Sequence, residues 1–249
     1  MRVSIAVDFT LSNLEITDFR SLHRLNKGDD MNQYQRAIFE VCNVMTPHAA
    51  GGKFYVYGFG GIPKYLDQTE VSRLWSLNTN QEDPSCEGTM AVLQAYQAAI
   101  LGTELAGPSY FGPLLSQIKG EIVDSIEDTG IEDNKLYHLA IIITDGNCHD
   151  MAETKRQLVE LSAMPFSAVV VGVGDGNFQD MQVLDADAEV LTDPEGRKAV
   201  RDIVQLVEYE EFRELGMREL ALEVLGEVPD QFVDYTVMMD SEVERKRMY

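Results

Sequence analysis

The sequence is short of basic residues. It contains 20 lysines and arginines against 42 aspartates and glutamates, which gives a formal net charge of -22. A protein that binds the phosphates of nucleic acid, or that adsorbs to anionic lipid, needs a basic surface. The composition therefore argues against nucleic-acid binding and against simple electrostatic attachment to a membrane. It is compatible with divalent cations as ligands.

Cysteine, histidine and long apolar runs are also scarce. The cysteines Cys42, Cys86 and Cys148 are odd in number and show no CxxC spacing, so a reducing, cytoplasmic setting is favoured over a disulfide framework. The four histidines form no i, i+4 pair, which argues against zinc. No apolar run approaches the about 20 residues of a membrane span, and the N-terminus does not read as a signal peptide.

Strand-like and helix-like segments alternate along the chain. Apolar runs predict five strands, the last more weakly than the others: residues 3–9, 53–60, 137–146, 167–174 and 188–193. Apolar residues at helical spacing predict helices at residues 33–45, 89–102, 113–128, 151–164, 196–207 and 217–235. This alternation is typical of an α/β fold with a mainly parallel sheet. The stretch 61–88 is polar and irregular, and we expect it on the surface.

Polar residues stand where two of these strands end. The first strand runs into Asp8, followed by Thr10 and Ser12 at alternate positions, and the 137–146 segment contains Asp145 near its end. Ser109 lies in a loop just before the helix that leads into that later strand. In open α/β sheets, ligand sites collect at the carboxyl ends of the strands. We therefore expect these five side chains to meet at one edge of the sheet.

The five candidate side chains supply two carboxylates and three hydroxyls. Such hard oxygen donors suit Mg²⁺, Mn²⁺ or Ca²⁺ and do not suit zinc or copper. With only two acids, a bound ion would keep an open position that could accept a carboxylate from another molecule. Thr89 also precedes a helix and is a competing hydroxyl, but the loop of Ser109 leads more directly to the strand of Asp145.

A resemblance to a known family extends over roughly residues 3–235. Asp-x-Thr-x-Ser after the first strand, a hydroxyl before a central helix and a later Thr-Asp-Gly resemble the metal-ion-dependent adhesion site of von Willebrand factor A domains. The detailed sequence of the chain resembles the copine A domain through an ordered set of segments: VDFTLSN, SLH, YGFGG, CEGTMAVLQAYQ, LAGPSYFGPLL, ITDG, DMAETKRQLVELSAMPFSAVVVGVGDGNFQDMQVLD, RDIVQLV and EVPDQFVDY. Any one of these motifs is weak, whereas their order is specific.

The resemblance implies a three-layer α/β sandwich with a central, mostly parallel sheet and helices on both faces. It implies metal ligation by Asp8, Thr10, Ser12, Ser109 and Asp145, and binding of an acidic side chain from a protein partner. Ser109 stands where copines usually have Thr, which keeps the hydroxyl and loses a methyl group. We expect a single domain over residues 1–240 and a charged tail over 241–249.

The family resemblance also limits what is expected of this chain. Copines carry two C2 domains that bind phospholipid with calcium, and the present sequence contains no such domain. Lipid binding is therefore not expected of it, and we expect a cytoplasmic protein that is recruited to membranes only where C2 domains accompany it.

Two alternatives to a binding module remain. A metal-dependent phosphohydrolase could use Asp8, although the haloacid-dehalogenase type has a second Asp where this chain has Thr10. A structural domain could also retain the same residues as a vestigial site. The glycines of YGFGG and GVGDG match no nucleotide-binding motif, and Cys148 has no evident partner for nucleophilic catalysis.

Overall fold

The structure is a computed structural model of the chain. It describes residues 1–26, 30–130, 136–185, 189–212 and 215–247. None of the helices in these ranges is both long enough and apolar enough to cross a bilayer.

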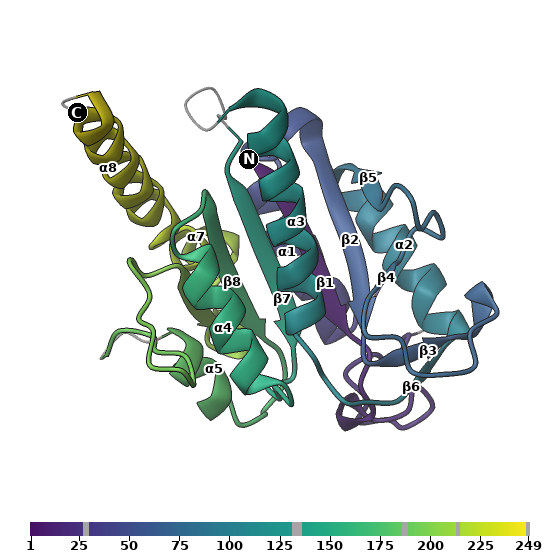
Figure 1. Cartoon of the computed structure of the whole chain (residues 1–249). Coiled ribbons are helices and arrows are strands. Elements are labelled where there is room, and N and C mark those ends of the chain that lie inside the picture. The colour runs from purple at the N-terminus through teal and green to yellow at the C-terminus, as the bar shows by residue number, and fades with distance from the viewer. Residues whose placement is uncertain (27–29, 131–135, 186–188, 213–214, 248–249) are drawn as a thin grey trace.

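A central sheet organises the molecule (Figure 1). Its strand order is β4-β2-β1-β7-β8-β9, and β5 also pairs with β2. The parallel strands are β1 (Arg2–Asp8), β2 (Lys53–Phe59), β7 (His138–Thr144), β8 (Phe166–Gly172) and β9 (Val204–Glu208). The short strands β4 (Trp75–Ser76) and β5 (Ser85–Glu87) are antiparallel to β2.

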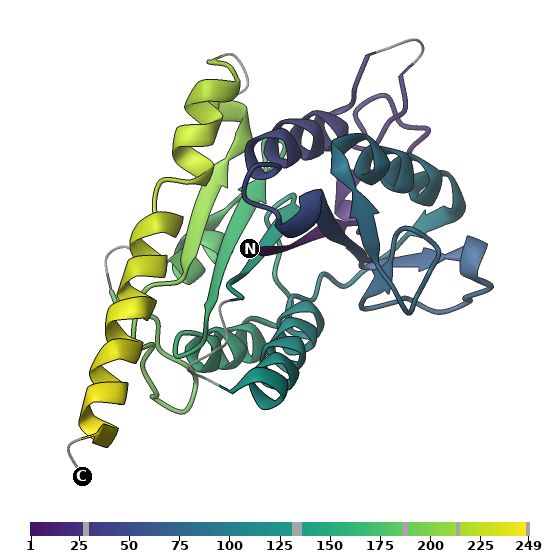
Figure 2. The ribbon, with the colours of Figure 1, turned by 90° about the horizontal axis from the view of Figure 1, so that it is seen from above.

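Helices cover both faces of this sheet (Figure 2). One face carries α1 (Gln33–Met45), α2 (Gly88–Gly102) and α7 (Met217–Val224), and the other carries α3 (Gly112–Thr129), α4 (Met151–Leu161) and α5 (Gln179–Asp185). Two shorter elements, β3 (Gly61–Pro63) and β6 (Thr103–Leu105), form a separate two-stranded sheet. The mostly parallel, three-layer α/β architecture predicted from the sequence is thereby confirmed.

The alternation of side chains along the strands produces two apolar cores. Ile5 and Val7 of β1 belong to the core beneath α1 and α2, whereas Ala6 between them belongs to the core beneath α3 and α4. Because successive side chains of a strand point to opposite faces, a strand covered on both faces must be apolar at every position. This explains the unbroken apolar run that precedes Asp8.

The C-terminal third differs from the sequence prediction. The expected strand at 188–193 is wrong over its described residues 189–193, which form only an isolated bridge between Thr192 and Lys198; residue 188 lies outside the described residues. The helix predicted at 196–207 is also wrong: its last residues belong to the edge strand β9, which continues to Glu208. The Asp202 side chain accepts the amide of Val204, the first residue of β9, and pairing with β8 from Ala168 opposite Val204 to Gly172 opposite Glu208 holds the segment as a strand.

The segment predicted as one helix at 217–235 forms two. Helix α7 ends at Val224, and α8 spans Val228–Arg247. Helix α8 contacts β8 and lies at the periphery of the molecule (Figure 2). Gln231 of α8 accepts a hydrogen bond from the Ser167 hydroxyl, and Phe232 packs edge-on against Tyr137. Helix α8 continues through residue 240, where the sequence suggested that the domain gives way to a tail.

Candidate metal centre

The strand register brings the two acidic residues to the same edge of the sheet. Strand β1 lies between β2 and β7, with Val7 opposite Gly58 on one side and Ile143 on the other. Asp8 at the end of β1 therefore lies level with Thr144, the last residue of β7, and Asp145 follows immediately. The two carboxylates come from positions far apart in sequence but adjacent in the sheet.

Asp8 is fully buried and accepts several hydrogen bonds. Its Oδ1 accepts from the Thr10 amide at 2.8 Å and from the Thr10 hydroxyl at 2.6 Å. Its Oδ2 accepts from the Thr144 hydroxyl at 2.7 Å and from the Ser109 hydroxyl at 3.4 Å. Three separate chain segments thus converge on one carboxylate.

The remaining candidates complete this cluster. The Ser12 and Thr10 hydroxyl oxygens lie 2.8 Å apart, and Ser12 is on the exposed side of the cluster. Asp145 is almost fully buried, and its Oδ1 accepts a hydrogen bond from Asn147 at 3.3 Å. All five side chains predicted as ligands lie at this edge, with Asp145 close enough to act electrostatically on Asp8.

The cluster is electrostatically unbalanced. Burial, with the nearby Asp145 carboxylate as the second cause, raises the pKa of Asp8 to about 7, although hydrogen bonds from Thr10 and Thr144 act to lower it. No lysine or arginine of the described residues forms an ion pair with either carboxylate. Ionisation of both acids is therefore costly unless a cation lies between them.

The donor set fits a hard divalent cation. It offers carboxylate and hydroxyl oxygens and no thiolate or imidazole among the five candidates, and Mg²⁺, Mn²⁺ and Ca²⁺ prefer oxygen ligands. In the described part of the chain no cluster of three or more His, Cys, Asp or Glu side chains could hold an ion. A cation at this edge would thus depend on two carboxylates, with hydroxyls supplying the other contacts.

The competing hydroxyl lies elsewhere. Thr89 is at the start of α2, directly after β5, and β5 pairs with the first residues of β2. This is the amino end of the parallel strands, opposite to Asp8. The Thr89 hydroxyl there donates to the Asn43 side chain of α1.

His23 supports this site and was not predicted from the sequence. The His23 Nε2 lies 2.8 Å from the Asp8 carbonyl oxygen, and its Nδ1 lies 2.8 Å from the Tyr96 hydroxyl oxygen. Because a carbonyl only accepts, Nε2 carries the proton and Tyr96 donates to Nδ1. Burial lowers the pKa of His23 to about 3, so the ring is neutral. Its hydrogen bond to the carbonyl oxygen holds the backbone of Asp8 in place.

Other supporting residues were also missed. The Asn13 side chain donates to the Thr10 carbonyl at 3.2 Å and accepts the Tyr34 hydroxyl at 2.8 Å, which anchors the loop after β1. His149 accepts the Ser109 amide on Nδ1 at 3.2 Å, and its own amide donates to the Ser109 carbonyl. The SLH and ITDG segments contained His23 and Thr144, but local spacing did not reveal what they contact.

A family model described as Copine matches residues 21–244. The chain belongs to the copine family. This match confirms the resemblance to copines that was identified in the sequence.

Solved structures also resemble this copine domain at low identity. One is manganese-loaded TRAP protein from Plasmodium vivax, with 13% identity, a TM-score of 0.49 and coverage of 86% of this chain and 71% of that chain. Another is proximal thread matrix protein 1 from the mussel byssus, with 12% identity, a TM-score of 0.49 and coverage of 90% and 45%. A second crystal form of the mussel protein gives 16% identity, a TM-score of 0.41 and coverage of 70% and 38%.

Proposed function

We propose that this copine domain is a divalent-cation-dependent protein-interaction module that accepts an acidic side chain from a protein partner. The observation that carries the proposal is the buried pair Asp8 and Asp145, which lies among hydroxyl groups and has no ion pair with a basic side chain of the described residues. A bound cation would balance the negative charge of this pair. The partner's carboxylate would complete the coordination.

Each residue has a distinct role in this proposal. Asp8 and Asp145 supply negative charge, and Thr10, Ser12 and Ser109 supply neutral oxygens. Bound Mg²⁺ or Mn²⁺ would offer an electrophilic position to an incoming carboxylate. Thr144 orients Asp8 through its 2.7 Å hydrogen bond, while His23 holds the Asp8 backbone in place. These contacts keep the ligand oxygens ordered before the partner arrives.

We favour binding over catalysis for this site. A phosphohydrolase of the type considered above has a second acid two residues after the first. Here that position is Thr10, whose hydroxyl donates a hydrogen bond to Asp8. Burial raises the pKa of the nearby Cys148 thiol to about 12, which disfavours the reactive thiolate. The three unpaired, buried cysteines support a cytoplasmic location.

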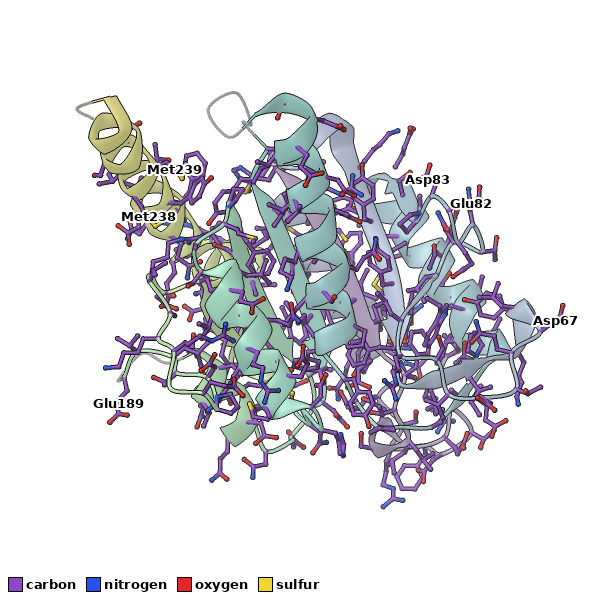
Figure 3. All side chains as sticks on the ribbon, in the orientation of Figure 1. Asp67, Glu82, Asp83, Glu189, Met238 and Met239 are labelled. Atoms are coloured by element: carbon purple, nitrogen blue, oxygen red, sulfur yellow. The ribbon has the colours of Figure 1, made fainter. Side chains whose placement is uncertain are left out.

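The proposal is tested by titrating the chelator-treated domain with MnCl₂ and with MgCl₂ in an isothermal titration calorimeter. Wild type is expected to bind about one ion, and Asp8→Ala and Asp145→Ala are expected to weaken binding at least tenfold. The matched control is Glu82→Ala, which removes an exposed carboxylate on the loop between β4 and β5, away from the ends of β1 and β7 (Figure 3).

Two results would contradict the proposal. Absence of binding by wild type at millimolar cation would favour a vestigial site. Equal binding by wild type and both Asp variants would locate the ion elsewhere on this acidic protein. Turnover of a phosphate ester with Mg²⁺, abolished by Asp8→Asn, would instead favour the phosphohydrolase alternative.

A further inference from the structure

A groove of about 390 Å³ lies beside the candidate metal centre. Its walls come from the loop before β4, the start of α3 and the start of α4, and include Arg73, Tyr110, Ser116 and His149. The groove is continuous with the metal centre through the backbone, because Tyr110 follows Ser109. The hydrogen bonds between Ser109 and His149 also join the two regions.

The groove presents hydrogen-bond donors. The Arg73 guanidinium lies 5.2 Å from the centroid of the Tyr110 ring and forms no ion pair with any described carboxylate. His149 accepts the Ser109 amide on Nδ1, so the neutral ring carries its proton on Nε2. The structure gives the Tyr110 hydroxyl no hydrogen-bond partner among the described residues. These groups could all donate to one acceptor.

The acids that also line the groove are already engaged. Asp150 accepts the amides of Phe111 and Gly112 at 3.0 and 2.9 Å, and it also accepts the Thr154 hydroxyl at 3.1 Å. Glu153 accepts from Arg156 at 3.3 Å and from Gln157 at 2.7 Å. The carboxylates are thus satisfied within the domain, whereas Arg73 is left to bind a group from outside.

We infer that this groove binds a second acidic side chain of the same partner, with Arg73 as the residue that selects it. The inference rests on the proposed function, because the first acidic side chain is the one at the cation. The domain carries a net charge of -22 and repels acidic segments generally, so an acidic partner can bind only where positive charge is exposed locally. Arg73 and the bound cation would provide attraction at two neighbouring points. The partner segment would therefore carry two acids at a fixed spacing.

The experiment uses a random linear peptide library displayed on phage. The library is selected against the wild-type domain in MgCl₂ and eluted with EDTA, in parallel with Arg73→Ala and with Arg218→Ala. Arg218 is an exposed arginine on α7, which packs against α1, so its loss makes the same change in net charge elsewhere. Wild type and Arg218→Ala are expected to select peptides with two acids at fixed spacing, and Arg73→Ala to select peptides with one.

A peptide from the wild-type selection is then synthesised, together with a version in which the second acid is replaced by its amide. We expect Arg73→Ala and the amide replacement each to weaken binding about threefold to tenfold, as for a partly exposed charge-assisted contact. Combining them should add little, because both remove the same contact. Tyr110→Phe, which keeps the ring under Arg73, should cost less than Arg73→Ala.

The outcomes separate the two hypotheses. Failure to recover any EDTA-eluted peptide would overturn the proposed function and the inference with it. EDTA-eluted peptides with a single acid, bound equally by wild type and Arg73→Ala, would leave the proposed function standing and overturn the role of the groove. Fully additive losses from Arg73→Ala and the amide replacement would also overturn it, because the two groups would then not touch.

Discussion

Replacing Asp8 by Asn should stabilise the cation-free domain at high pH. Burial and the neighbouring Asp145 raise the pKa of Asp8 from 3.8 to about 7, so the folded protein holds a proton that the unfolded chain has released. Stability from the protonated carboxyl is therefore fully present below pH 3.8 and is lost as the pH rises through 7. Asn mimics the protonated form and does not ionise.

The size of the effect follows from the two pKa values. At about 1.4 kcal/mol per pKa unit, the full shift corresponds to about 4 kcal/mol, and between pH 5 and pH 8 wild type should lose about 2–3 kcal/mol relative to Asp8→Asn. This corresponds to about 4–12 °C in Tm for a chain of this size. The contribution of His23, whose pKa is lowered to about 3, cancels because both proteins contain it.

The assay is urea unfolding with EDTA at pH 5 and pH 8, repeated at pH 8 with saturating MgCl₂. The difference in the free energy of unfolding between the two proteins should widen with pH in EDTA. Added Mg²⁺ should stabilise wild type alone and reduce that difference. A difference that stays constant between pH 5 and pH 8 would refute the reasoning, because it would mean that Asp8 is ionised throughout.

Substitutions at three further positions test the framework around the site, two of them with a control substitution elsewhere. His23→Ala should cost about 2–5 kcal/mol of unfolding free energy in urea, since it opens a cavity, removes the donor to the Asp8 carbonyl and removes the acceptor of the Tyr96 hydroxyl, whereas exposed His48→Ala should change little. Ser109→Thr should retain cation binding in calorimetry and Ser109→Ala should weaken it about tenfold, and equal affinities would show that this hydroxyl is not a ligand. Gly176→Ala should lower both Tm and cation affinity because its Cβ would overlap the Asp145 carbonyl oxygen, while Gly120→Ala, in an open helical position, should raise Tm slightly.

The central strands were predictable because burial on both faces leaves a strong local pattern. Ile141, Ile142 and Ile143 of β7 are all buried, which requires apolar residues at consecutive positions. The edge strand β9 was not predictable in this way. Its segment also has apolar residues at helical spacing, and only pairing with β8 in the folded chain decides between the two structures.

The same contrast applies to the site. Asp8 and Asp145 each follow an apolar strand, so the rule that ligands gather at the carboxyl ends of strands was enough to bring them together. His23 could not be found by that rule, because it contacts Asp8 only through the backbone carbonyl of that residue. Its ring is held in place by stacking on Tyr34 and Phe9. Such contacts depend on how the loop after β1 folds back over the sheet edge.

The direction of β1 determines how this domain can be held in an experiment. The chain starts at the amino ends of the parallel strands, opposite to the metal centre at their carboxyl ends, and α8 ends toward that same side (Figure 1). A strand of the length of β1 spans about 23 Å at about 3.3 Å per residue. A tag or surface linker at either end is thus separated from the candidate site by about the length of the β1 strand. Immobilisation through the ends of this segment should leave the Asp8 edge facing the solution.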